Sequence, residues 1–323
     1  MALITGKDII KAAKFLTQNE IVAIPTETVY GLAANALDAG AVLKIFEAKN
    51  RPHFDPLIVH IGNKADIDRY VLNVPATAQK LINAFWPGPL TLVLPKKDII
   101  PDLLTSGLSE VAIRMPNHPL TLELLRLLSF PLAAPSANPF GYISPTTAQH
   151  VEEQLGDKIP YILDGGPANI GVESTIVRFE DEKVIVLRLG GIPVEEIAKI
   201  ASEVEIQVNP NDNPVAPGQL SSHYAPRKPL YVGNIAELLD EFKDKRIGLI
   251  SFGKAIYSNT SRQWNLSPDS DLHEAAKNLF RTLREADASD VDVIIARYVP
   301  DEGLGKAIND RLRRGNYKLG IRN

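Results

Sequence analysis

The chain has 323 residues, of which 45% are hydrophobic, and a formal net charge of -4. This length and composition predict two domains, each with a hydrophobic core of its own. The slightly acidic charge argues against a protein that coats nucleic acid, and the absence of cysteine excludes disulfides, thiolate nucleophiles and cysteine-ligated metal sites.

The first two-thirds of the chain read as a mixture of short strands and helices. In chain order, the predicted elements are a helix at 7–18, a strand at 21–24, a helix at 39–49, a strand at 57–61, a helix at 77–85, strands at 90–94 and 111–114, a helix at 118–128, a strand at 132–134, a helix at 146–155, and strands at 161–163, 174–178 and 184–187. Few of these form regular β–α–β repeats. We therefore predict an α/β fold with a twisted, mixed sheet rather than a doubly wound one.

The composition changes after about residue 208. Segment 209–229 is rich in Pro and Asn, which predicts a linker. A more regular order follows, with strands at 230–232, 247–252 and 291–296 and helices at 235–242, 272–286 and 304–314. This order predicts a small Rossmann-like parallel three-layer domain with right-handed crossovers. The predicted division is a first domain at 1–208, the linker at 209–229 and a second domain at 230–323.

Polar signatures stand at five places where an apolar run gives way to a turn. They are Pro25 to Leu32, Lys49 to Pro52, Arg114 to Pro116, Pro135 to Asn138 and Glu173 to Thr175. Donors at a strand end lie at the rim of a sheet, where α/β domains bind their ligands. One such ending is ordinary loop chemistry, but five in one region indicate a common site.

Each signature by itself leaves two interpretations open. Lys49 and Arg51 could complement the end of a helix or grip phosphate oxygens. Ser136 and Asn138 could form a simple turn. A lone histidine at a strand end, such as His60, is more often structural than catalytic.

The order of these motifs resembles a known family. Lys49-x-Arg51 followed by Ser136-x-Asn138 marks the YrdC-type domain of the threonylcarbamoyl-AMP synthases. The neighbouring segments agree with it: Pro25 to Leu32, Pro56-Leu57, Trp86 to Thr91, Val111 to Pro116, Pro135 to Gly141 and Glu173 to Thr175. Later segments resemble the long form of the family, with a Sua-type C-terminal domain: Ser222 to Pro226, Gly303 to Gly305 and Ile308 to Leu312. The resemblance covers essentially the whole chain, and the ordered set of motifs is very specific.

The resemblance implies a nucleotidyltransferase. It would join L-threonine, bicarbonate (or CO2) and ATP into L-threonylcarbamoyladenylate and release pyrophosphate. In the family this adenylate feeds the threonylcarbamoyl modification of the tRNA adenosine next to the anticodon. The implied partners are therefore these three substrates and the downstream tRNA threonylcarbamoyl-transfer machinery, without a membrane and without a stable nucleic-acid complex.

The resemblance also implies the site residues. Lys49 and Arg51 would be catalytic. The ATP-binding set would be Lys49, Arg51, Asp55, Ser136, Asn138, Ser144, Arg188 and Tyr224. The threonine-binding set would be Thr28, His60, Arg114, Ala134 and Ser174. Asp55 could equally be structural, and Arg114 could instead pair with a surface carboxylate. One departure is Glu110, which stands where family members often carry Thr or Ser, so a hydroxyl contact to ATP is lost there.

The predicted linker carries Ser222-His223-Tyr224, an aromatic and polar cluster that a passive tether does not need. One interpretation is a patch that docks on its own domain. The other, which the family favours, is a lid over the bound nucleotide with Tyr224 touching ATP.

No phosphate-binding loop of the Gly-x4-Gly-Lys-Ser/Thr or Gly-x-Gly-x-x-Gly type is present, and the histidines show no metal-ligand spacing. We expect no protein-held metal, only Mg2+ that arrives with ATP. Residues 1–7 lack the apolar core of a signal peptide and no apolar stretch could span a bilayer, so we expect a cytoplasmic protein.

Two other functions are weighed against the synthase. One is a YrdC-containing carbamoyltransferase of hydrogenase maturation, which the lack of cysteine-rich zinc modules argues against. The other is a module whose basic concave face binds double-stranded RNA. Pyrophosphate release that depends on threonine and bicarbonate would separate both from the synthase.

Overall fold

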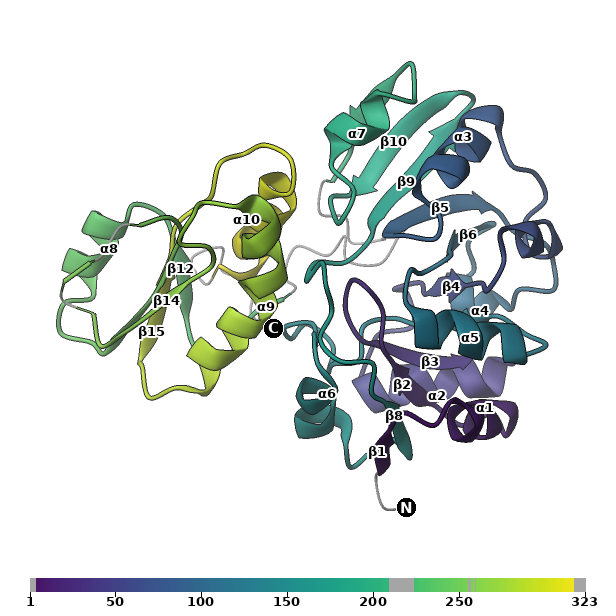
Figure 1. The fold of residues 1–323 in the computed structure, drawn as a ribbon, viewed down its shortest axis with the longest axis horizontal. Helices are drawn as coiled ribbons and strands as arrows, with labels where there is room; N and C mark the ends of the chain where they lie inside the picture. Colours follow the sequence, from purple (N-terminus) through teal and green to yellow (C-terminus); the bar gives the residue numbers. More distant parts are fainter. Residues whose placement is uncertain (1–3, 209–223, 255–256, 259, 317–323) are drawn as a thin grey trace.

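The computed structural model describes residues 4–208, 224–254, 257–258 and 260–316. Figure 1 shows a large sheet with helices on both sides and, beside it, a smaller sheet with helices of its own. The large sheet has eleven strands, in the order β1, β8, β2, β3, β7, β4, β6, β5, β9, β10, β11. The sheet contains both parallel pairs, such as β4 with β6, and antiparallel pairs, such as β5 with β6, so the prediction of a mixed sheet is confirmed.

The strands of the large sheet are β1 (Ile4–Gly6), β2 (Val22–Ile24), β3 (Gly31–Asn35), β4 (Ile58–His60), β5 (Leu90–Pro95), β6 (Glu110–Arg114), β7 (Leu132–Ala133), β8 (Tyr161–Leu163), β9 (Thr175–Glu180), β10 (Lys183–Arg188) and β11 (Val204–Ile206). The helices are α1 (Ile9–Thr17), α2 (Ala39–Lys49), the 3-10 helix η1 (Lys64–Arg69), α3 (Ala76–Phe85), α4 (Asp102–Thr105), α5 (Pro119–Leu127), α6 (Ala148–Leu155) and α7 (Val194–Ala198).

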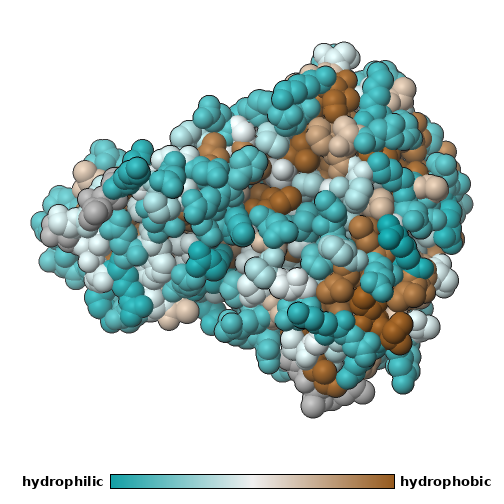
Figure 2. Space-filling view, viewed as in Figure 1, coloured by the Kyte–Doolittle hydropathy of each residue, from teal (hydrophilic) through white to brown (hydrophobic). Residues whose placement is uncertain are grey.

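The strand residues alternate between two cores, one on each face of the sheet. Along β2, Ala23 belongs to the core beneath α2, α3 and α6, whereas Val22 and Ile24 belong to the core beneath α1 and α5. This period of two is what a strand buried on both faces requires. In Figure 2 apolar side chains gather at the lower right, over the helices of the large sheet; Ile10 of α1 and Leu127 of α5 are exposed.

The C-terminal part forms the predicted parallel domain. Its elements are β12 (Leu230–Val232), α8 (Ile235–Glu241), β13 (Ile247–Ser251), β14 (Arg262–Asn265), α9 (Leu272–Ala288), β15 (Val293–Ala296) and α10 (Gly305–Gly315). The four strands lie in the order β12, β15, β13, β14, and all pairs are parallel. Alternate residues of β15 pack under α8 on one face and under α9 and α10 on the other, which gives three layers.

The C-terminal domain is packed against the larger one through α9 and α10. One apolar core joins Val29, Ile143 and Val172 of the larger domain to Phe280 of α9 and Leu312 of α10. The domain limits at 208 and 230 stay predictions, and of the predicted linker only residues 224–229 are described. Among the described helices, none is both long and apolar enough to cross a bilayer.

Candidate active site

The strand ends converge as the motifs indicated. His60 and Arg114 end the adjacent parallel strands β4 and β6 and are opposite each other in the register. Ser136, just after β7, forms an isolated bridge with Gly31, the first residue of β3. Around these ends lies a pocket that is open to solvent. Its walls are formed by Thr26, Thr28, Val29, Gly31, Arg51, Ile58, His60, Arg114, Ala134, Pro135, Ser136, Glu173, Ser174, Arg188 and Tyr224.

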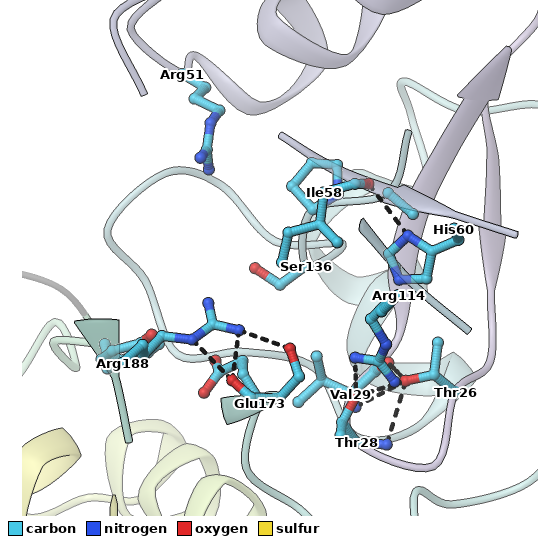
Figure 3. A pocket seen from close by; sticks show the side chains of 15 residues that line it. Thr26, Thr28, Val29, Arg51, Ile58, His60, Arg114, Ser136, Glu173 and Arg188 are labelled. Carbon is cyan, nitrogen blue, oxygen red and sulfur yellow. Dashed lines mark hydrogen bonds between the residues drawn. The ribbon is translucent and has the colours of Figure 1, made fainter. Parts of the chain in front are cut away.

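At one end of the pocket Arg114 faces the Thr26–Thr28 loop (Figure 3). Its Nη2 donates to Glu27 Oε1 at 2.7 Å and its Nη1 to Thr28 Oγ1 at 3.3 Å. The Thr28 hydroxyl also lies 2.7 Å from that of Thr26. Burial lowers the pKa of Arg114, and the Glu27 carboxylate opposes that shift. Arg114 is therefore held by a buried ion pair rather than by a surface carboxylate.

Arg188 occupies the neighbouring wall, at the end of β10. Its Nε and Nη2 donate to the Ser174 carbonyl at 3.0 and 2.8 Å, and Nη2 also donates to Ser174 Oγ at 3.0 Å. The Ser174 hydroxyl lies 2.7 Å from that of Thr91. Burial lowers the pKa of Arg188. The two residues thus form one rigid polar unit in which a guanidinium and a hydroxyl lie together.

Arg51 comes from the end of α2. The following turn is set by Asn50, which takes the left-handed conformation at φ 50° that often ends a helix. The Arg51 guanidinium donates to the carbonyls of Asp55 and Pro56 at 3.0 and 2.9 Å and pairs with the Asp55 carboxylate at 2.8 Å. Arg51 is therefore buried in an ion pair just after the helix, and its role toward ATP stays a prediction.

Lys49 is buried behind this wall and does not line the pocket. Its Nζ donates to the Ser136 carbonyl at 2.5 Å and to the Asn138 carbonyl. Burial, and then the charge of Arg51, hold the pKa of Lys49 well below its usual range. Lys49 therefore donates to the Ser136–Asn138 loop, and its catalytic role and its contact with ATP stay predictions.

Three other predicted residues lie behind the pocket wall. Asp55 is fully buried beneath Arg51, and burial raises its pKa. The Asn138 amide donates to the Pro139 and Tyr142 carbonyls, at 2.9 and 2.8 Å. Ser144 donates from Oγ to Glu173 Oε1 at 2.6 Å. Their roles toward ATP stay predictions.

His60 lies in the pocket wall as a neutral imidazole. Its Nδ1 lies 3.1 Å from the Ile58 carbonyl, and burial, aided by the charge of Arg114, lowers its pKa to about 3. A neutral ring with this pKa neither supplies a proton nor carries positive charge near neutral pH. Its contribution at pH 7 is therefore packing and hydrogen bonding.

The C-terminal half contributes to the pocket through Tyr224. The ring is 1% exposed, stacks on Phe280 of α9 with ring centroids 5.6 Å apart, and lies 4.9 Å from the Arg311 guanidinium carbon. Ser222 and His223 lie outside the described residues. Tyr224 docks on the chain's own domains and also lines the pocket. The lid over bound ATP stays a prediction, because segment 209–223 lies outside the described residues.

Glu173 and Arg311 are among the residues at the site to which the sequence assigned no role. Glu173 and Arg311 both stand in quoted motifs, and the structure pairs them at 2.9 Å. A charged residue directly before the polar pair Ser174-Thr175 was a usable signal for Glu173. Arg311 had no comparable signal, because only the packing of α10 brings it to the pocket. Glu110 does not line the pocket but lies 3.9 Å from Arg178 on the sheet surface.

The chain matches known families, related sequences and solved structures. Residues 14–190 match the Sua5, YciO and YrdC family, described as "Telomere recombination", and residues 192–315 match the family described as "Threonylcarbamoyl-AMP synthase, C-terminal domain". The chain is 43% identical to the threonylcarbamoyl-AMP synthase of Pyrococcus abyssi, over 95% of this chain and 94% of that one. It is 42% identical to the threonylcarbamoyl-AMP synthase of Bacillus subtilis, over 95% and 92% of the two chains.

Among solved structures, the chain is similar to the crystal structure of P. abyssi Sua5 complexed with L-threonine. The TM-score is 0.92 at 42% identity, with 98% of this chain and 97% of that chain covered. The likeness therefore extends over both sheets and the contact between them.

Proposed function

The chain belongs to the Sua5/YrdC family of threonylcarbamoyl-AMP synthases, in the long form with the C-terminal domain, and we propose that it makes L-threonylcarbamoyladenylate from L-threonine, bicarbonate (or CO2) and ATP. Three buried arginines and several hydroxyls around one pocket are the observation that carries this proposal. They suit a reaction between anions.

The proposed chemistry has two steps. The threonine amine adds to CO2 with loss of a proton, or to bicarbonate with loss of water, to give an N-carboxylate. An oxygen of this carbamate then attacks the α-phosphorus of ATP, the bond from that phosphorus to the bridging oxygen breaks, and pyrophosphate leaves. Both partners are negatively charged, so catalysis needs charge neutralisation and alignment rather than a protein nucleophile.

We assign the amino acid to the end of the pocket formed by Arg114 and Thr28. The Arg114 guanidinium suits a carboxylate, and the hydroxyls of Thr28 and Ser174 suit the threonine side chain. His60 and Ala134 form the adjoining wall. P. abyssi Sua5, which resembles this chain over nearly its full length, has been solved with L-threonine.

We assign ATP to the remaining walls, where Arg51, Ser136, Arg188 and Tyr224 lie. The two guanidiniums suit the phosphate oxygens. Asp55 holds Arg51 in place, and Lys49 holds the Ser136–Asn138 loop. Mg2+ enters as part of the substrate MgATP and keeps much of its water. The described residues contain no cluster of carboxylates and histidines that could hold a metal by itself.

The product contains a labile mixed anhydride and must be handed on to an acceptor. We propose that the acceptor is the tRNA threonylcarbamoyl-transfer machinery, and that the protein acts in the cytoplasm. A stable nucleic-acid complex is not expected, because the formal net charge is -4.

The decisive test is pyrophosphate release by the purified protein. Release should require ATP, L-threonine and bicarbonate together, and omission of any one should abolish it. Mass spectrometry should find threonylcarbamoyladenylate in the complete mixture only. Pyrophosphate release without threonine would refute the proposal, and tight binding of double-stranded RNA without turnover would favour the RNA-binding module.

A further inference from the structure

Arg311 belongs to α10 of the C-terminal domain, but its guanidinium reaches a pocket wall of the other domain. The side chain is fully buried, at 0% exposure. Its Nε donates to Glu173 Oε2 at 2.9 Å and its Nη2 to the Leu189 carbonyl at 2.8 Å. Both acceptors lie in the larger domain, next to Ser174 and Arg188 respectively. Arg311 therefore holds together the two chain segments that carry Ser174 and Arg188.

Glu173 transmits this contact to the site. Its side chain lies beside Arg188 in the pocket wall (Figure 3). Glu173 Oε1 accepts a hydrogen bond from Ser144 Oγ, whereas Oε2 is taken by Arg311. One carboxylate oxygen is thus fixed from within the larger domain and the other from the C-terminal domain.

Tyr224 receives a second contact from the same guanidinium. The Arg311 guanidinium carbon lies 4.9 Å from the centroid of the Tyr224 ring, within the range of a cation–π interaction. The ring also lines the pocket. A single arginine of the C-terminal domain therefore contacts two residues that line the pocket.

The charge of Arg311 is maintained despite its burial. Burial by itself lowers its pKa, but its charged and polar neighbours, among them Tyr224, Glu173 and Asp310, raise the pKa above the usual range. A buried ion pair of this kind adds little net stability, because desolvation offsets the attraction. Removing one partner leaves the other charge buried and unpaired, and here that charge would be a carboxylate in the wall of a site proposed to bind a polyanion.

Other contacts already hold the two domains together. Arg284 of α9 donates to the carbonyls of Ile143 and Ser144, and the Tyr142 hydroxyl donates to Asp287 at 2.6 Å. The shared apolar core adds to them. The contact between the two domains does not require the Arg311–Glu173 pair, so we look for another role for the buried Arg311 charge.

We propose that Arg311 is a positioning residue of the active site: it fixes Glu173 and Tyr224 and neutralises the Glu173 carboxylate, so that the nucleotide phosphates can bind beside it. This inference rests on the proposed function, because it names ATP as the polyanion. It gives the C-terminal domain a part in substrate binding that acts through Glu173 and Tyr224.

The test uses the full chain with Arg311→Met, Glu173→Gln and the double variant. Arg313→Met is the matched control, since Arg313 lies on the same helix and is exposed. Calorimetry measures the Kd for ATP, and pyrophosphate release gives the KM for ATP and kcat. Arg311→Met should weaken ATP binding about tenfold, within the range of coupling between contacting residues. Glu173→Gln should restore most of that loss in the double variant, because the unpaired charge is gone, and Arg313→Met should match the wild type.

A purely structural role predicts a different pattern. Arg311→Met would then lower the thermal midpoint without changing the Kd for ATP of the folded protein, or Glu173→Gln would fail to restore binding; either result overturns the inference. If Arg311→Met does not fold, Arg311→Lys takes its place, because it keeps the charge but loses the planar fork, and it should weaken ATP binding. The calorimetric Kd for ATP tests this inference even if the wild type releases no pyrophosphate. Absence of pyrophosphate release would refute the proposed function but not the role of Arg311 in ATP binding.

Discussion

The guanidinium of Arg51 lies 2.8 Å from the carboxylate of Asp55, and the two side chains are only 4% and 0% exposed. The pair stands between the end of α2 and β4, at the edge of the pocket. Both Asp55 carboxylate oxygens lack a conventional hydrogen bond among the described residues, so the arginine is their main compensation. A change at Arg51 therefore acts on folding and on substrate binding at the same time.

Arg51→Ala should destabilise the protein and strongly reduce turnover. Loss of the arginine leaves the Asp55 carboxylate buried and unpaired, which costs about 3–5 kcal/mol. Loss of a phosphate donor should lower kcat/KM by roughly 10²–10³-fold. Denaturant unfolding and pyrophosphate release measure the two effects.

The Arg51→Ala/Asp55→Asn double variant separates these effects. It removes the unpaired charge, so it should recover much of the stability and none of the turnover. Normal pyrophosphate release by this double variant would show that Arg51 does not contact ATP.

His60 should make the protein less stable in acid. Its pKa is lowered to about 3 in the folded state, below the ordinary value near 6.5, because the ring is buried. Between these two values the unfolded chain binds more protons, so the free energy of unfolding falls as the pH drops below about 6.5. One such histidine contributes up to about 1.4 kcal/mol per pH unit in that window.

Unfolding of the wild type and of His60→Gln in urea, at pH 5 and pH 7, measures this slope. Between pH 7 and pH 5 the free energy of unfolding should fall less for the variant than for the wild type, although at pH 7 it should be lower for the variant. Burial also lowers the pKa values of His118 and His150, so the unfolding free energy of the variant should still fall with pH, but less steeply. Equal slopes in the two proteins would contradict a buried neutral His60.

Most of the fold followed from hydrophobic periodicity. Helix 39–49 and strand 161–163 were predicted with the bounds that the structure has. Strand β14 was missed because Arg262–Asn265 has no apolar run and lies at the edge of its sheet. Strand β3 was missed because its Gly-Leu-Ala-Ala-Asn sequence has low strand propensity. Its pairing with β2 and β7 overrides that preference.

The site was predictable to the extent that it lies at strand ends. His60, Arg114 and Ser136 come together because their strands are neighbours in one sheet, and polar residues at strand ends signal such a rim. The side on which a residue faces was not predictable. Lys49 and Arg51 are two positions apart, yet Lys49 faces the backbone of a loop and Arg51 faces the pocket. Partners such as Glu173 and Arg311, which are 138 positions apart, are set by domain packing alone.

Threonine should be preferred to valine through its hydroxyl. A site that hydrogen-bonds an OH leaves polar groups unpaired when the isostere binds, so kcat/KM for valine should be roughly 10⁴-fold lower. The available partners are the hydroxyls of Thr28 and Ser174. Pyrophosphate release with each amino acid measures the preference, and similar kcat/KM values would mean that the amino-acid site lies elsewhere.

Two variants identify the partner. Thr28→Val removes one hydroxyl from the pocket. Thr91→Val leaves the pocket lining intact but removes the group 2.7 Å from Ser174 Oγ. If Ser174 hydrogen-bonds the threonine hydroxyl, Thr91→Val should lower the ratio of kcat/KM for threonine to kcat/KM for valine. If Thr28 makes that hydrogen bond, only Thr28→Val should lower this ratio.

Tyr224 should contribute to nucleotide binding beyond its contribution to stability. Tyr224→Ala removes a buried ring and should cost about 3–5 kcal/mol of unfolding free energy, as other large aromatic truncations do. Tyr231→Ala is the matched control, because the Tyr231 ring packs against Phe242 with ring centroids 4.4 Å apart and does not line the pocket. Both variants should lower the thermal midpoint, but only Tyr224→Ala should raise the KM for ATP. Phe280→Leu, which weakens the stack that holds Tyr224, should raise that KM by a smaller factor. A KM for ATP that stays at the wild-type value in folded Tyr224→Ala would reduce Tyr224 to a contact between the domains.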